Sequence, residues 1–141
     1  MIMSGFIKRL RADNLGSTMV EFALVAPALM AFIFLILEGG RMIWTKQLLE
    51  DAALDSARCL GLRALPCKTD AGVQAFAVEQ ATSSGVRLLT ANVTVQANVA
   101  CNGTNGLGRV RLEVPYSSPA AGFLPVKIDK LSAEACFPMV M

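Results

Sequence analysis

A glutamate near the start of the chain lies four residues inside a long apolar stretch, at a defined spacing from a glycine and a serine. Gly16 precedes the stretch, Ser17 begins it, and Glu21 follows Ser17 by four residues. A carboxylate in an apolar span is costly, so it is normally kept for a function. If the bond after Gly16 were cleaved, Ser17 would gain a free α-amine one helical turn from Glu21. The two charges could then neutralise each other, within one chain or between neighbours, and favour correctly staggered neighbours.

A second interpretation of Glu21 needs no partner. Because Glu21 lies near the end of the apolar stretch, its side chain could extend to the lipid headgroups. Gly16 at the fitting distance favours the paired interpretation. Both interpretations stay open at the level of sequence.

The apolar stretch is long enough to cross a bilayer. Residues 22–37 are sixteen consecutive uncharged residues, and the stretch from Ser17 is interrupted only by Glu21. At the helical rise, residues 17–37 span roughly 31 Å, close to the ~30 Å hydrocarbon core of a membrane. We therefore predict a transmembrane helix over 17–38. Pro27 removes one backbone hydrogen bond and predicts a kink in it.

The basic excess of the chain lies before this stretch. Hydrophobic residues make up 54% of the sequence and charged ones 17%, and the net charge is +2. Residues 1–16 are predicted to be a leader, and their Lys8, Arg9 and Arg11 indicate a cytoplasmic N-terminus with export of the C-terminal side. Because no small-residue signal-peptidase site follows Leu37, we expect the span to be retained. A basic tail does not indicate nucleic-acid binding.

Helical spacing continues over 39–61, which predicts that the helix extends beyond the membrane with Gly61 as its stop. The apolar stripe of this extension is Leu48, Leu49, Ala52, Ala53, Ala57 and Leu60. Asp70 is predicted to cap a second helix that ends near residues 83–85.

Further along, the apolar period changes to two. Residues 93–101 and 110–116 alternate and predict an antiparallel hairpin with a long loop, and Leu131 to Phe137 suggests a third strand. The expected fold class is α+β, with a long N-terminal transmembrane helix extending into a small periplasmic domain that has a second helix and about three antiparallel strands. The predicted domain of residues 62–141 completes the chain.

Four cysteines follow the predicted span, and an even number in an oxidising compartment suggests two disulfides. They are Cys59, Cys67, Cys101 and Cys136. Proximity favours Cys59–Cys67, which leaves Cys101–Cys136, although alternation places Cys101 and Cys136 on opposite faces of their strands. A bulge or an early strand end would reconcile the second pair. Free buried thiols are the alternative.

Catalytic and cofactor chemistry has little support in the sequence. Histidine is absent, and there is no Cys-x-x-Cys, phosphate-binding loop or Gly-x-Ser-x-Gly elbow. We therefore expect no enzyme, no cofactor and no metal site.

The segment Gly16 to Glu21, after a short basic leader and before an apolar helix, resembles the prepilin processing site of type IV pilin-like proteins. The runs Val20–Pro27, Glu38–Arg41 and Asp51–Arg58 are similar to the TadE-like family, minor pilins or pseudopilins of the tight-adherence (Flp) pilus system. The resemblance covers residues 16–58, roughly a third of the chain.

This resemblance implies roles for three residues: Gly16 as the last leader residue, Ser17 as the mature N-terminus and Glu21 as the assembly carboxylate. The implied partners are a prepilin peptidase, other pilin or pseudopilin subunits, the inner-membrane assembly platform and the bilayer. The implied location is the bacterial inner membrane, single-pass, with a periplasmic C-terminal domain, and incorporation into an extracellular pilus is one of the roles it allows. The resemblance assigns no role to the four cysteines.

Two other functions compete with this one. A permanently anchored bitopic protein would use residues 62–141 to bind a ligand or partner. A membrane-tethered redox enzyme would use Cys59 and Cys67. The first would retain residues 1–16, and the second would turn over thiol substrates.

Overall fold

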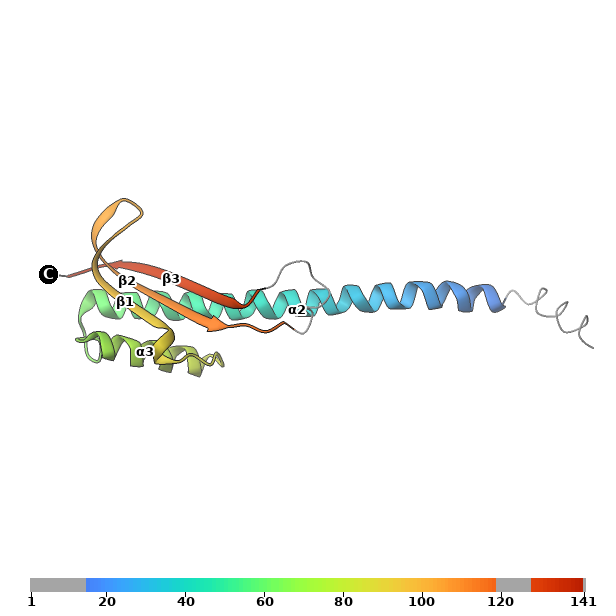
Figure 1. The fold of residues 1–141 in the computed structure, drawn as a ribbon, viewed down its shortest axis with the longest axis horizontal. Coiled ribbons are helices and arrows are strands. Elements are labelled where there is room, and N and C mark those ends of the chain that lie inside the picture. Colours follow the sequence, from blue (N-terminus) through green and yellow to red (C-terminus); the bar gives the residue numbers. More distant parts are fainter. Residues whose placement is uncertain (1–14, 119–127, 141) are drawn as a thin grey trace, which may run out of the picture. The chain divides into compact units, whose positions relative to one another are not determined.

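The computed structural model describes residues 15–118 and 128–140, within two compact units that divide between Gly39 and Gly40. Most of the predicted leader, residues 1–14, lies outside the described residues. The elements, labelled in Figure 1, are α2 (Leu15–Leu62), α3 (Asp70–Ser83), the short 3-10 helix η1 (Thr90–Asn92), β1 (Val93–Cys101), β2 (Thr104–Pro115) and β3 (Lys130–Pro138). The α+β class, with a long apolar helix, a second helix and an antiparallel sheet, is confirmed.

Helix α2 ends later than Gly61, so the prediction of Gly61 as its stop was wrong. The helix ends at Leu62, and Arg63 takes the left-handed conformation with φ 51°. Gly61 is instead needed for close packing. A Cβ atom built on Gly61 would lie 2.5 Å from Phe137 Cδ1 and 2.5 Å from the carbonyl oxygen of Pro138. The absence of a side chain therefore allows α2 to approach the end of β3.

Helix α3 is capped one residue earlier than predicted. Thr69, in an extended conformation, is the N-cap, and its Oγ1 accepts a hydrogen bond of 3.1 Å from the Gly72 N–H. Asp70, predicted as the cap, is the first helical residue, where its charge favours the positive end of the helix dipole. The buried face consists of Val73, Ala77 and Ala81, and the helix ends at Ser83 as expected.

The described strands form an antiparallel sheet in the order β1-β2-β3. The predicted long loop between the first two strands was wrong, because β2 already begins at Thr104. Only Asn102 and Gly103 separate the strands, and both have positive φ, 49° and 83°. Asn-Gly with two positive φ angles favours the tight type I′ turn, whose twist matches that of a hairpin.

The core of the second unit lies between the sheet, the C-terminal part of α2 and α3 (Figure 1). Leu49, Ala53 and Ala57 of α2 are fully buried in the same cluster as Val110 and Leu112 of β2. The small side chains of α2 allow the other elements to approach closely. The predicted stripe is confirmed except at Leu48, which is only partly buried.

Hydrogen bonds from helix side chains reach both edge strands of the sheet. Lys46 Nζ of α2 donates to the carbonyl oxygen of Ser132 in β3, and Gln74 Nε2 of α3 donates to the carbonyl oxygen of Val93 in β1 at 3.1 Å. Exposed strand edges are sites of unwanted pairing. Each helix thus occupies a backbone acceptor on one edge.

The contrast between two helical glycines gives a test of this packing. Gly61→Ala should lower the free energy of unfolding of the second unit, because overpacking costs about 1–3 kcal/mol and exceeds the gain of about 1 kcal/mol in helix propensity. Gly40→Ala should raise it, because Gly40 has no atom within 4 Å of an added Cβ. Urea unfolding of both variants measures the signs. Equal effects would contradict the close approach at Gly61.

Candidate functional site

Gly16 and Ser17 lie in the first turn of α2, which begins at Leu15. Glu21 lies four residues after Ser17 on the same helix, so one helical turn separates their backbone positions. The Glu21 side chain is exposed in the isolated chain. The helical conformation required by the predicted charge pair is therefore present. Cleavage after Gly16 and the pairing itself stay predictions.

An exposed apolar surface surrounds Glu21. Met19 is 78% exposed, Phe22 74% and Leu24 73%, and large apolar side chains remain exposed as far as Leu37. No part of the most apolar window of the helix is buried within the chain, and its mean hydropathy is 2.5. A surface of this kind requires lipid or a partner to cover it. The helix is long and apolar enough to cross a membrane, which is consistent with a single-pass membrane protein.

Pro27 lies inside α2 without ending it. A proline in a helix interior leaves the carbonyl four residues earlier without its usual partner. Such positions are tolerated in membrane helices when neighbouring groups satisfy the freed carbonyl. The kink at Pro27 stays a prediction.

The cysteines form both expected pairs, Cys59–Cys67, which proximity favoured, and Cys101–Cys136, which remained by elimination. Cys59–Cys67 joins the last turns of α2 to the loop before α3, with 5.7 Å between the two Cα atoms. Cys67 is fully buried, and its N–H donates to the carbonyl oxygen of Ala64. On the loop-entropy model, this short ring contributes about 2.6 kcal/mol to stability. The bond thus holds the connection between the two helices.

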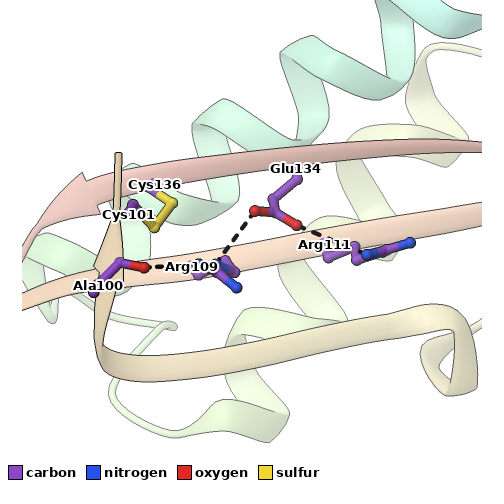
Figure 2. The surroundings of a disulfide bond; sticks show 6 residues. All are labelled: Ala100, Cys101, Arg109, Arg111, Glu134 and Cys136. Carbon is purple, nitrogen blue, oxygen red and sulfur yellow. Dashed lines mark hydrogen bonds and ion pairs between the residues drawn. A yellow bond between two sulfur atoms is a disulfide. The ribbon is translucent and has the colours of Figure 1, made fainter. Parts of the chain in front are cut away.

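Cys101–Cys136 joins the two edge strands across β2, as Figure 2 shows. Neighbouring strands lie about 4.8 Å apart, so the edges of a flat sheet would be nearly twice that distance apart. The observed Cα–Cα distance is 6.5 Å. The far end of β1 must therefore bend over the sheet toward β3.

Two irregularities in the hairpin explain this bend. The register shifts between Gln96 and Val99 and again between Val99 and Cys101. Asn98 in β1 has φ 56° and Gly106 in β2 has φ 79°, which are left-handed conformations. Bulges of this kind bend a strand and increase its twist. The bulge considered from the sequence is present, and it reconciles the opposite faces of Cys101 and Cys136.

Arg109 lies beside this disulfide and contacts both strands that the bond joins (Figure 2). Its terminal nitrogen donates a hydrogen bond of 2.8 Å to the carbonyl oxygen of Ala100 in β1. Its Nε lies 3.3 Å from Glu134 Oε1 in β3, as an ion pair without hydrogen-bond alignment. Arg109 therefore supports the bent end of the hairpin from the middle strand. No sequence pattern marks Arg109, because its partners depend on the register of the strands.

Charged side chains continue along this outer face of the sheet. Arg111 Nε donates to Glu113 Oε1 at 3.0 Å, and Lys130 Nζ donates to Glu113 Oε2 at 3.2 Å. These two hydrogen bonds hold the pKa of Glu113 below its ordinary value of 4.5, and the one from Lys130 has the larger effect. These partly exposed pairs orient side chains but contribute little each to stability.

The described residues, 15–118 and 128–140, contain no group of three or more His, Cys, Asp or Glu side chains that could hold a metal ion. The charged groups on the sheet are paired with one another, as the ion pairs of Arg109, Arg111 and Glu113 show. The candidate functional site is therefore the exposed apolar part of α2, which contains the Glu21 carboxylate.

Comparison with known protein families gives a match that falls on this helix. Residues 16–58 match the family model of TadE-like proteins. No curated protein and no solved structure matches the chain. The TadE-like match confirms the expected resemblance over about a third of the chain, and it begins at Gly16 and includes Glu21. The match shows similarity to TadE-like proteins within this part of α2.

The ion pairs of Glu113 predict an acid-dependent contribution to stability. Because the folded pKa is lowered, this contribution is complete above pH 4.5 and is lost as the pH falls through the folded value. Glu113→Gln should therefore flatten the fall in unfolding free energy below pH 4.5. Urea unfolding at a series of pH values measures it, with Glu79→Gln on α3 as the control. A slope unchanged in Glu113→Gln would contradict the ion-pair assignment.

Proposed function

We propose that this chain is a minor pilin or pseudopilin that takes part in assembly of a tight-adherence (Flp-type) pilus. A prepilin peptidase cleaves the precursor after Gly16, and the retained helix packs with other pilin subunits on the inner-membrane assembly platform. The observation that carries this proposal is the position of Glu21. This carboxylate lies in an exposed apolar helix, within the residues that match the TadE-like family model.

The energetics of Glu21 explain why assembly would follow cleavage. A carboxylate in the hydrocarbon core is costly when it has no partner, and a paired, hydrogen-bonded one is tolerated. Before cleavage, the nitrogen of Ser17 is an uncharged peptide group. After cleavage it is an ammonium group one helical turn from Glu21, or close to the Glu21 of a neighbour in the correct stagger. Cleavage thus creates the cation that favours ordered packing.

The second unit fits an exported position. Its two disulfides are typical of an oxidising compartment. The basic residues before the span favour a cytoplasmic N-terminus, so the unit from Gly40 onward would lie in the periplasm. We therefore propose a single-pass protein of the bacterial inner membrane.

We also propose that the chain has no catalytic role. Full burial of Cys67 opposes thiol exchange at Cys59–Cys67, because reactive cysteines are accessible and electropositively placed. The permanently anchored binding protein is the remaining alternative, and it differs from a processed pilin in retaining residues 1–16.

Gly16→Lys should give a full-length precursor that does not assemble, because a long charged side chain would replace the glycine beside the cleaved bond. Intact mass of the protein extracted from membranes measures this, since processing removes residues 1–16. Gly5→Lys adds the same charge elsewhere in the leader and should be processed normally. A Gly16→Lys protein of mature mass would refute the site, and a wild-type protein that begins at Met1 would favour the anchored alternative.

Glu21→Ala should be processed normally and incorporated poorly. A pair worth only about 1.4 kcal/mol changes an assembly equilibrium about tenfold. The measurement is the ratio of assembled to membrane-bound subunit, with Glu38→Ala as a control carboxylate at the other end of the apolar stretch. Full assembly of Glu21→Ala would contradict the charge-pair argument.

A further inference from the structure

The two disulfides of the second unit lie in different surroundings. Cys67 is fully buried in the hydrophobic core, and Cys59 packs against that core. Among the described residues, the core cluster includes neither Cys101 nor Cys136. Their bond lies beside the charged side chain of Arg109 (Figure 2), and Cys136 is partly exposed. One disulfide thus belongs to the core, and the other lies on the polar outer face of the sheet.

This difference decides which bond an external thiolate can open. Thiol–disulfide exchange requires access to one sulfur, while the other sulfur leaves as a thiolate. Attack at Cys59 would release the thiolate of Cys67 inside the apolar core, where an unpaired charge is costly. Attack at Cys136 would release the thiolate of Cys101, which is 6% exposed but adjoins the exposed turn residue Asn102. The bond on the outer face is therefore the easier one to open.

The Cys101–Cys136 bond also holds a bend that regular strand pairing does not require. Residues 93–96 of β1 pair with β2 in a constant register, and the register shifts only beyond them. Asn98 has φ 56°, a left-handed conformation that is unfavourable for residues other than glycine. Residues 96–98 and 102–106 are exposed. Release of this end of the hairpin from β3 would therefore leave the core intact.

We propose that Cys101–Cys136 is a redox-sensitive site, at which an external dithiol releases the bent end of the hairpin. One thiolate of the dithiol attacks Sγ of Cys136, the bond between the two sulfurs breaks, and Cys101 leaves as a thiolate that takes up a proton. The second thiol of the dithiol then resolves the mixed disulfide.

Two electrons pass to this chain in the exchange. The dithiol is oxidised to a disulfide, Cys101 and Cys136 become thiols, and Cys59–Cys67 stays oxidised. The released hairpin end can then move away from β3 while the rest of the sheet keeps its pairing. This inference goes beyond the proposed function, and it depends neither on cleavage of the leader nor on pairing of the carboxylate in the apolar helix.

Thiol trapping separates the two bonds, because each cysteine falls in its own tryptic peptide. The full chain in detergent micelles is treated with dithiothreitol as the dithiol probe, and free thiols are alkylated at successive times. We expect alkylation of Cys101 and Cys136 to be about tenfold faster than that of Cys59 and Cys67, whose reduction requires local opening of the core. In concentrated urea, the two bonds should be reduced at similar rates.

Amide hydrogen exchange measures the conformational effect. Reduction of Cys101–Cys136 alone should raise exchange about tenfold in residues 97–107 and leave residues 110–114 of β2 unchanged. The double variant Cys101→Ser, Cys136→Ser should show this pattern without dithiol and no further response to it. Arg109→Gln removes the side chain that contacts both edge strands but keeps the disulfide, so its exchange should match that of the oxidised wild-type chain.

Four results would overturn the site. Equal or faster reduction of Cys59–Cys67 in the folded chain would contradict the argument from burial. Unchanged exchange in residues 97–107 after reduction would show that the bend persists without the bond. A rise in exchange throughout the second unit would indicate a bond that stabilises the whole fold, and high exchange in oxidised Arg109→Gln would assign the bend to the cation.

Discussion

The need to cover the apolar surface of one helix governs this protein. In the first unit, α2 exposes large apolar side chains on all sides. Among the described residues of that unit, none covers them. In the second unit, the apolar residues of the same helix form a single stripe, which is buried in the core with the sheet and α3. The first surface needs lipid or other subunits, and the second is satisfied by the chain itself.

The second unit achieves a stable core with few large side chains. Alanines of α2 and α3 permit short distances between elements, and a glycine at position 61 allows contact with Phe137 and the backbone of Pro138. A small domain with such a core buries limited apolar surface, and disulfides commonly supplement it. Here Cys59–Cys67 and Cys101–Cys136 restrict the connections at the end of α2 and at the end of the hairpin.

The bent hairpin shows how backbone conformation and covalent bonding act together. Left-handed residues at Asn98 and Gly106 turn the end of β1 and β2, and this turn brings Cys101 within bonding distance of Cys136. Arg109 then contacts Ala100 on one side and Glu134 on the other. The outer face of the sheet thus carries the Cys101–Cys136 disulfide and the Arg109 side chain, while its inner face is apolar.

The spacing of apolar residues was enough to predict the long apolar helix, its buried stripe from Leu49 to Leu60 and the three strands. The position of Glu21 within the apolar helix also follows from the sequence alone. Each of these features depends only on residues that are close together in the chain. Spacing in the sequence favoured the Cys59–Cys67 pair, whereas Cys101–Cys136 followed only by elimination and needs the register shifts of β1. Only the tertiary structure decided that α2 continues through Gly61, that Asn102 and Gly103 form the whole turn, and that Arg109 joins both edge strands. These features depend on contacts between residues far apart in the chain, such as Gly61 with Phe137, and on a register shift that no alternating pattern reveals.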